Sequence, residues 1–284
     1  MLASRPVRTR LVFRLERSRP PIRKPSMKRI SSRDNADFKR FMAVRGRKER
    51  GLILVEGERL LEEAVKARLR IEITALDETA AKDPSRSWGS GTRICFADPL
   101  FRSLTGVETS QGVIAIIERP TFTDSWLHKT NTFVLILDGV QDPGNVGALI
   151  RTAEAAGVDG VLMTEGCADP LSPKALRSSA GSALRLPHLR DLTAAHALER
   201  LPPGTTVMAM VAASGAPSLF DAPMKRPLAL ALGSEGKGLS AELERAATLR
   251  VRIPQARPVE SLNVAAAAAI ALFEIAGREG ALKN

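Results

Sequence analysis

The stretch TFVLILDGVQDPGNVGALIRTAEAAG, residues 132–157, decides the fold class. Five large apolar residues, 133–137, end at Asp138, and a glycine-rich loop leads into a helix that we expect to begin at Asn145 and to be capped by it. Strands as uniformly apolar as FVLIL are buried on both faces, which is typical of a parallel sheet covered by helices. Ligands of such sheets bind beyond the carboxyl ends of the strands. The stretch therefore predicts an α/β domain with a site in this loop.

Two further blocks have the same character. ALGSEGKGLS, residues 231–240, follows the apolar run PLALAL, and RIPQARPVESLNVAAAAAIALFE, residues 252–274, follows the run LRVRI. The glycine spacing of the second block fits neither a Walker A loop nor a dinucleotide-binding fingerprint. Glu235 within it would repel phosphates, so the loop favours a cationic or neutral polar ligand, and S-adenosylmethionine qualifies. Together, the three loops predict one composite pocket.

Strands and helices alternate through the rest of this region. We expect strands at residues 160–163, 206–211, 227–232 and 249–253, and helices at 173–179, 194–201, 240–247 and from Asn263 onward. Residues 132–284 are therefore predicted to form one domain with a mostly parallel sheet covered by helices on both faces.

The first half of the chain predicts a smaller α/β domain over residues 28–118. Its helices are expected at residues 35–50, 58–67 and 99–104, and its strands at 52–57, 71–76, 93–97 and 112–117. Residues 119–131 have no clear period and contain Pro, Thr and Asp, which is typical of a linker.

Charge is distributed unevenly along the 284 residues. Residues 1–30 hold ten basic side chains and one acidic side chain, so the other 254 residues contribute only +2 of the net charge of +11. Residues 1–27 are interpreted as a basic tail. A transit peptide and a phosphate-binding arm are both compatible with it, but we favour an extension outside the fold, because Met27 begins an ordinary domain start.

Cysteine and histidine are scarce. Cys95 and Cys167 lie far apart, and the three histidines form no metal-binding pattern. No apolar run is long enough to span a bilayer. We expect free thiols, no metal, no membrane and a cytoplasmic location.

The three blocks resemble the motifs of the SpoU/TrmH family of RNA ribose 2′-O-methyltransferases (SPOUT superfamily), which read N-x-G-A-x-x-R-T-A, L-G-x-E-x-x-G and I-P-x-x-x-x-x-E/S-S-L-N-V. The matching residues are Asn145, Gly147, Ala148, Arg151, Thr152 and Ala153, then Leu232, Gly233, Glu235 and Gly238, then Ile253, Pro254, Glu260, Ser261, Leu262, Asn263 and Val264. Residues 54–64 and 101–116 are similar to the family's N-terminal RNA substrate-binding domain, whose fold occurs in some ribosomal proteins. The resemblance covers roughly residues 28–278.

The resemblance implies a specific fold, cofactor and set of site residues. The fold would contain a deep trefoil knot in the C-terminal sheet, and the protein would be a homodimer that acts on RNA. S-adenosylmethionine would contact Leu232, Gly233, Ile253 and Leu262. The catalytic residues would be Arg151 at the centre, with Asn145, Glu235, Ser261 and Asn263 around it. A guanidinium stays protonated, so we expect Arg151 to hold a phosphate and stabilise the developing alkoxide rather than act as a base.

Two alternatives stay open at this point. The first is a non-catalytic RNA-binding or ribosome-assembly factor that retains the fold, and the second is an unrelated nucleotide-binding α/β enzyme. The near-neutral fold with its own N-terminal domain favours ribosomal over transfer RNA. Gln255 and Arg257 stand where the family often has Met and Gly, which affects the third loop.

Overall fold

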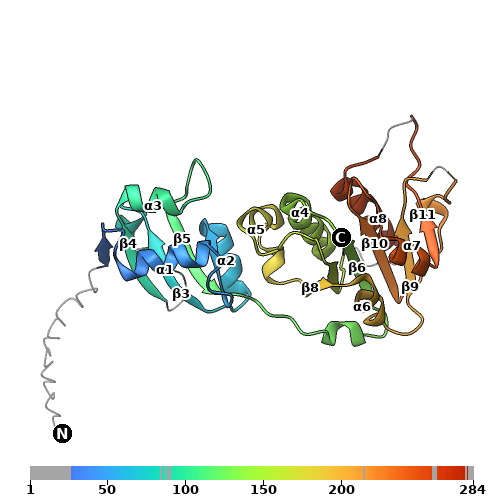
Figure 1. Ribbon diagram of the computed structural model, residues 1–284, viewed down its shortest axis with the longest axis horizontal. Helices are drawn as coiled ribbons and strands as arrows, with labels where there is room; N and C mark the ends of the chain where they lie inside the picture. Colours follow the sequence, from blue (N-terminus) through green and yellow to red (C-terminus); the bar gives the residue numbers. More distant parts are fainter. Residues whose placement is uncertain are drawn as a thin grey trace, which may run out of the picture.

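The computed structural model describes residues 27–83, 85, 86, 88, 91–213, 215–257, 261–278 and 280. Two α/β domains lie side by side, joined by a linker that runs along one edge of the molecule (Figure 1). The predicted tail, apart from Met27, and Glu260 lie outside the described residues. Within the part of the chain that is described, no helix is long and apolar enough to cross a bilayer.

The N-terminal domain is built on a five-stranded sheet in the order β1-β4-β3-β5-β2. β1, β4 and β3 are parallel, whereas β5 runs antiparallel to β3 and β2. The strands are β1 (Lys28–Ile30), β2 (Leu52–Glu56), β3 (Ile71–Leu76), β4 (Thr92–Phe96) and β5 (Val113–Glu118), and the helices are α1 (Ala36–Arg45), α2 (Glu58–Lys66) and α3 (Asp98–Leu104).

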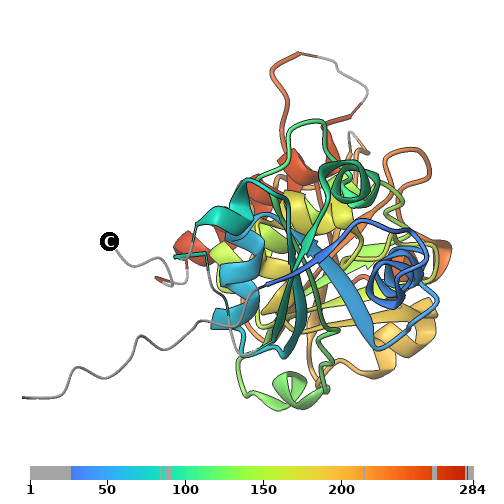
Figure 2. The same ribbon diagram turned by 90° about the vertical axis from the view of Figure 1, so that its left-hand side faces the viewer.

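Helices cover both faces of this sheet because its strands present apolar side chains alternately to each side. Phe41 of α1 and Phe101 of α3 pack on the face that contains Phe96 and Ile114. Leu61 of α2 packs on the opposite face. The domain is therefore a three-layer sandwich, seen end-on in Figure 2.

The C-terminal domain contains six parallel strands in the order β11-β9-β10-β6-β7-β8. The strands are β6 (Phe133–Asp138), β7 (Gly160–Thr164), β8 (His188–Leu192), β9 (Thr206–Met210), β10 (Leu228–Gly233) and β11 (Leu249–Val251). The α-helices are α4 (Pro143–Ala155), α5 (Pro173–Ser179), α6 (Ala194–Glu199), α7 (Ala241–Ala246) and α8 (Val264–Arg278), and short 3-10 helices lie at η3 (Ser182–Leu184) and η4 (Leu219–Asp221).

The central strands β6 and β10 explain the layering of this domain. Leu135 and Leu230 face a core shared with α4, α5 and α8, whereas Ile136 and Ala231 face a second core shared with α6 and α7. All four side chains are fully buried. The predicted α/β fold with helices on both faces of a parallel sheet is confirmed, as is the smaller N-terminal α/β domain. The trefoil knot stays a prediction.

The linker, residues 119–131, is attached to the C-terminal domain. It contains the 3-10 helix η2 (Ser125–His128), whose Trp126 and Leu127 are buried in the core beside α6. A Cβ atom at Gly160, the first residue of β7, would lie 2.6 Å from the Trp126 ring. Only glycine allows the indole to approach this closely, so Gly160 fixes where the linker packs.

The two domains share a hydrophobic core rather than touching only through the linker. Leu60 and Leu61 of α2 belong to the same buried cluster as Leu176 of α5 and Leu184 of η3. At the edge of this junction Arg185 donates to Glu63 of α2 and, at 2.9 Å, to Glu154 of α4. Apolar packing and ion pairs together hold the two domains in one arrangement.

Two expected helices have clearly different bounds, and one strand was not expected. The helix predicted over residues 35–50 ends at Arg45, because Arg47 adopts a left-handed φ of 58° and the N–H of Lys48 turns back to the carbonyl of Ala43. The helix expected from Asn145 begins two residues earlier, at Pro143. β8 was not expected, because its sequence HLRDL is polar, and as an edge strand it keeps several side chains exposed.

Candidate active site

The first motif loop joins β6 to α4 and is set by Asp142. The Asp142 carboxylate caps α4 by accepting the N–H of Asn145 at 2.9 Å, and it also accepts a hydrogen bond from Lys174 of α5 at 2.6 Å. The bond from Lys174, followed by that from the Asn145 N–H, lowers the pKa of Asp142. The expectation that Asn145 caps the helix is therefore wrong, and its side chain is available for another contact.

That contact joins the three motif loops. Glu235, in the loop after β10, accepts hydrogen bonds on Oε1 from the amide of Asn145 and, at 3.2 Å, from the amide of Asn263. The Asn263 amide also lies 3.4 Å from Oδ1 of Asn145. Residues separated by as many as 118 positions in the chain thus form one polar cluster.

The orientation of Asn263 is determined by α8. Its Oδ1 accepts the N–H groups of Ala265 at 3.0 Å and of Ala266 at 3.3 Å, in the first turn of that helix. With the oxygen held by the helix, the amide nitrogen points toward Glu235 and Asn145. Asn263 therefore serves both as the start of α8 and as a donor in the cluster.

Arg151 does not join this cluster. It lies on α4, six residues after Asn145, and its side chain is exposed. At 100° per residue the two side chains project from α4 about 120° apart. Among the described residues, Arg151 has no hydrogen bond or ion pair, so its guanidinium is free to bind an external phosphate or carboxylate.

A pocket of about 650 Å³ opens beside the cluster, at the carboxyl ends of β9, β10 and β11. All four residues expected to contact the cofactor line it, together with two of the expected catalytic residues: Leu232, Gly233, Ile253 and Leu262, then Glu235 and Ser261. Its size falls in the range of pockets that enclose small ligands.

The motif implies that Gly233 contacts the cofactor, but the structure shows that glycine is required there by the fold of its own loop. A Cβ atom there would lie 2.0 Å from the carbonyl carbon of Gly238 and 2.3 Å from the N–H nitrogen of Leu239. The loop after β10 folds back on the end of the strand, with paired hydrogen bonds between Ser234 and Gly238. Gly233 thus permits the loop to close on its own backbone, which shapes the pocket.

Several residues of the site could not be identified from the motifs. Asp138, at the end of β6, is buried and accepts hydrogen bonds from the Thr164 hydroxyl at 2.8 Å and from the N–H of Ser240 at 2.6 Å. It therefore ties β6, β7 and the start of α7 together beneath the motif loops. In the sequence, the one indication of this role was an acidic residue at the end of a buried apolar run.

The pocket wall also includes residues of β9 and the third loop outside the matched motif positions. Met210 ends β9, which lies next to β10 in the sheet, and Val211 follows it. Gln255 and Arg257 come from the loop after β11. The two departures from the family pattern thus lie directly on the pocket. No group of three or more His, Cys, Asp or Glu side chains able to hold a metal occurs in the described part of the chain.

The two domains match two known families. Residues 132–273 match the SpoU rRNA Methylase family, and residues 37–115 match the MRM3-like substrate binding domain. These matches agree with the two domains of the structure and leave the linker between them unmatched.

Whole-chain relatives give the same result. The chain is 36% identical to the 23S rRNA (guanosine(2553)-2′-O)-methyltransferase RlmP of Bacillus subtilis, over 88% of this chain and 100% of that protein. It is 33% identical to a 23S rRNA (guanosine-2′-O-)-methyltransferase RlmB of a Burkholderia species, over 74% of this chain and 92% of the relative.

Solved structures extend the similarity to the fold. The SpoU methyltransferase AviRb from Streptomyces viridochromogenes, in complex with AdoMet, has a TM-score of 0.78 at 26% identity, covering 88% of this chain and 100% of that one. An AdoMet-bound rRNA methyltransferase from Sinorhizobium meliloti has a TM-score of 0.77 at 30% identity, covering 91% and 100%. With three motif loops meeting at one pocket, a family match over its C-terminal domain and relatives that it covers end to end, this chain belongs to the SpoU rRNA methylase family.

Proposed function

We propose that this protein transfers a methyl group from S-adenosylmethionine to a ribose 2′-hydroxyl of RNA, with ribosomal RNA as the substrate. The observation that carries the proposal is the meeting of Asn145, Glu235 and Asn263 beside the pocket at the ends of β9, β10 and β11. The curated relatives named above are 23S rRNA methyltransferases, which supports ribosomal over transfer RNA.

The pocket has the properties that S-adenosylmethionine requires. Leu232, Ile253 and Leu262 provide apolar surface for the adenine ring, and the glycines of the second loop expose backbone groups to the polar parts of the molecule. Glu235 places a carboxylate near a cofactor that carries positive charge. When bound, the cofactor supplies an electrophilic methyl group, and these residues position it for in-line attack.

The polar cluster would align the ribose. Glu235 holds two amides with one carboxylate oxygen, so Asn145 and Asn263 are fixed before the substrate arrives. Preorganised amide groups can orient a hydroxyl without reorganising during the reaction. Ser261, at the edge of the same pocket, adds a further hydroxyl.

Arg151 is assigned to the phosphate next to the target ribose. Its guanidinium is a donor only, with a fork of N–H groups that matches a phosphate and can stabilise negative charge developing on the 2′ oxygen. Its exposure and lack of partners among the described residues support this role.

We further propose that the protein is a homodimer that uses the outer face of α8. Ile270 and Phe273 on this face are 38% and 43% exposed, and Phe220 of the neighbouring η4 is 42% exposed. Large apolar side chains grouped on a surface mark a protein interface. Because α4 packs against α8, such a dimer would have its interface near the site. We place the protein in the cytoplasm, where an enzyme of bacterial-type ribosomal RNA would meet its substrate.

Two measurements test the function. Titration with S-adenosylmethionine by calorimetry should show saturable binding, and incubation with tritiated cofactor and a 23S rRNA transcript should label 2′-O-methyl groups. A protein that binds the transcript but neither binds the cofactor nor labels RNA would instead be the RNA-binding or assembly factor. Mapping the methyl groups that disappear in a deletion strain identifies the nucleotide.

A further inference from the structure

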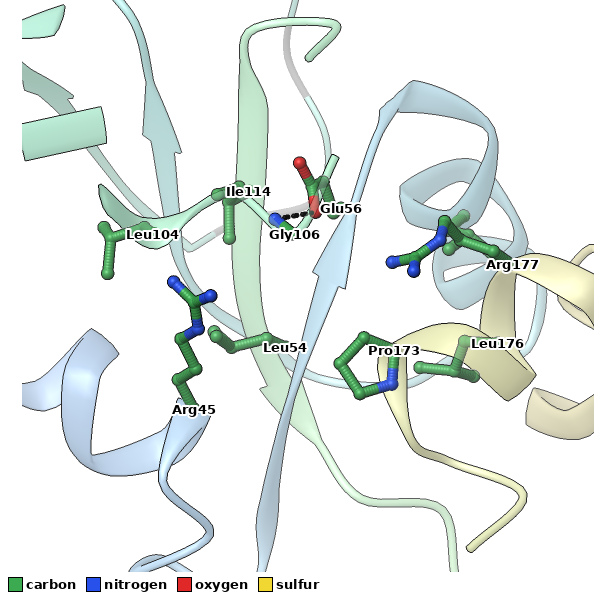
Figure 3. A pocket seen from close by; sticks show the side chains of 10 residues that line it. Arg45, Leu54, Glu56, Leu104, Gly106, Ile114, Pro173, Leu176 and Arg177 are labelled. Atoms are coloured by element: carbon green, nitrogen blue, oxygen red, sulfur yellow. Dashed lines mark hydrogen bonds between the residues drawn. The ribbon is translucent and has the colours of Figure 1, made fainter. Parts of the chain in front are cut away.

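A second pocket lies where the two domains meet, on the other side of α5 from the first motif loop. Its walls come from both domains: β2, α2, β5 and the segment after α3 on one side, and α5 on the other (Figure 3). It encloses about 190 Å³, which is below the size of a pocket for a whole cofactor and suits a single planar ring.

Apolar side chains form most of this pocket. They are Leu54, Leu60, Leu104, Ile114, Pro173 and Leu176. Pro173 and Leu176 approach from α5, opposite Leu54 and Ile114 of the N-terminal sheet (Figure 3). An opening between two apolar walls can hold a ring that is stacked or inserted between them.

Three charged side chains also line the pocket. Arg45, at the end of α1, and Arg177, on α5, lie on opposite sides of the opening (Figure 3). Glu56 is the one acid on the wall, and its Oε2 accepts the N–H of Gly106 at 3.0 Å. Its Oε1 is buried and has no hydrogen-bond partner among the described residues.

The arginines around the pocket have no carboxylate partner in the described part of the chain. Arg177 has no hydrogen bond or ion pair, and Arg45 donates only to the carbonyl of Ser103. An adjoining groove shares Arg45, Leu54 and Pro173 with the pocket and adds Arg47 and Arg50, which are exposed and also without ion pairs. The acids that line this groove, Glu49, Asp169 and Asp191, pair with other arginines, so Arg45, Arg47 and Arg50 keep no carboxylate partner among the described residues.

α5 connects this pocket to the active site. On one side Pro173, Leu176 and Arg177 line the pocket, and on the other Ser178 donates to the carbonyl of Gly144 at 2.7 Å. A Cβ atom at Gly147 would lie 2.4 Å from the carbonyl of Ala175, so α5 and α4 are in backbone contact. A ligand held at the junction is thus separated by one short helix, α5, from the first turn of α4, which carries Asn145.

We propose that this junction pocket binds one unpaired base of the RNA substrate, with the phosphates that flank it on the arginines of the groove. The inference rests on the proposed function. Apolar walls accept a base ring, and arginines that lack carboxylate partners complement a phosphate backbone, whereas a protein segment would have to supply acidic side chains at matching positions. RNA-binding proteins commonly read bases that are splayed out of a helix. Such a base would hold the RNA across both domains and set the distance to the target ribose.

Filling the pocket provides the sharpest test. Gly106 has no positive φ, and a Cβ atom there would make ordinary contacts of 3.6 Å with Glu56 and 3.7 Å with Arg177. Gly106→Leu should therefore fold, and its side chain would occupy the pocket. Gly51→Leu is the matched control, because Gly51 belongs to the same domain, lines neither pocket and has open space around it.

Affinity for a 23S rRNA transcript should fall about tenfold in Gly106→Leu, the scale of losing one bound base, and should be unchanged in Gly51→Leu. S-adenosylmethionine affinity should be the same in both. Equal RNA affinity in Gly106→Leu and wild type, or an equal loss in both variants, overturns the proposal. If the wild type binds neither cofactor nor transcript, the proposed function itself has failed.

The variant Arg177→Ala tests independently whether Arg177 contacts a phosphate that flanks the bound base. The plot of log affinity against log salt should become shallower by about 0.7, the value for one phosphate contact on a single strand. An unchanged slope overturns the phosphate contact.

Ultraviolet cross-linking to the same transcript, followed by mass spectrometry, should yield adducts on peptides that contain Leu104 or Pro173. Cross-links confined to other faces exclude the pocket. Saturable binding of free nucleoside monophosphates that Gly106→Leu abolishes without affecting RNA affinity would assign it to a free nucleotide instead.

Discussion

The active-site pocket and the junction pocket are assembled in opposite ways. The first stands at the carboxyl ends of neighbouring parallel strands, and much of its wall comes from loops whose residues were recognisable as motifs. The second draws one to three residues from each of six segments of two domains, none of which belongs to the three motif loops. The chemistry is thus concentrated in loops on a rigid sheet, whereas the fit to RNA depends on how two domains pack. Changes at the first should alter chemistry or cofactor binding, and changes at the junction should alter stability or RNA affinity.

The largest effect is expected from Arg151→Ala. Loss of a donor to charge that develops in the transition state should reduce methyl transfer by at least about a hundredfold. Because the side chain is exposed and forms no hydrogen bond or ion pair with a described residue, folding and cofactor affinity should stay as in wild type. The measurement is single-turnover methylation of a 23S rRNA transcript. Arg245→Ala, an exposed arginine on α7, is the control, and near-normal turnover in Arg151→Ala would remove this residue from the mechanism.

Acid should destabilise the protein through His188, which lies beside the linker. Burial lowers the pKa of His188 from 6.5 to about 4, and its ring packs against Phe122 at 4.7 Å between centroids. The unfolded chain therefore binds the proton more tightly, so stability is lost as the pH falls from about 6.5 toward 4. The free energy of unfolding should drop by about 2 kcal/mol more in wild type than in His188→Gln between pH 7.5 and 5. Urea unfolding at the two pH values measures this, and parallel losses in both proteins contradict it.

Gly233→Val should weaken S-adenosylmethionine binding at least tenfold. The added Cβ atom would overlap the backbone of Gly238, so the loop after β10 must move away from the pocket. Gly236→Val is the matched control in the same loop, because a Cβ atom there meets nothing within 4 Å. Calorimetric titration compares the two variants, and equal cofactor affinities would place the pocket elsewhere.

At the junction, Arg185→Ala should lower the free energy of unfolding by about 1 kcal/mol, because Glu63, only 14% exposed, loses one of its two cationic partners. Arg200→Ala breaks an exposed pair with Asp124 and should change stability by less than about 0.5 kcal/mol. Denaturant unfolding distinguishes the two. A larger loss in Arg200→Ala than in Arg185→Ala would contradict the importance of the junction.

The smallest effect is expected from removal of residues 1–26. The melting temperature and cofactor affinity should not change, and RNA affinity should fall modestly at low salt, because the lost basic groups would otherwise displace counterions from phosphates. Binding to the transcript at low and at physiological salt checks this. Loss of methylation at physiological salt would make the tail part of RNA recognition.

Sequence reasoning predicted most of the elements because periodic burial is a local property. The bounds of β3 and α5 agree with expectation to the residue, since both are delimited by clear changes in polarity. β8 was missed because an edge strand need not be apolar on both faces. Asp142 rather than Asn145 caps α4, because Pro143 occupies the first helical position and the helix therefore begins two residues earlier than expected.

The site was predicted as a set of residues but not as a geometry. Motif matching selected Asn145, Glu235 and Asn263, yet their hydrogen bonds cross 28 to 118 positions and depend on the order of the strands. Arg151 was expected at the centre of this set, and the structure shows it outside the cluster on an exposed face of α4. The residues that the N-terminal domain contributes to the junction pocket lie in the stretches 54–64 and 101–116, which resemble a substrate-binding domain, but the pocket itself could not be predicted because its walls exist only once the domains are packed.

The core shared by α2, α5 and η3 couples the unfolding of the two domains. At Gly181, with a φ of 90°, a Cβ atom would lie 2.7 Å from the Cβ of Glu63, so backbone of one domain rests directly on a side chain of the other. Neither domain can melt without exposing apolar surface of its neighbour. Heat should therefore be absorbed in a single calorimetric peak that covers both domains.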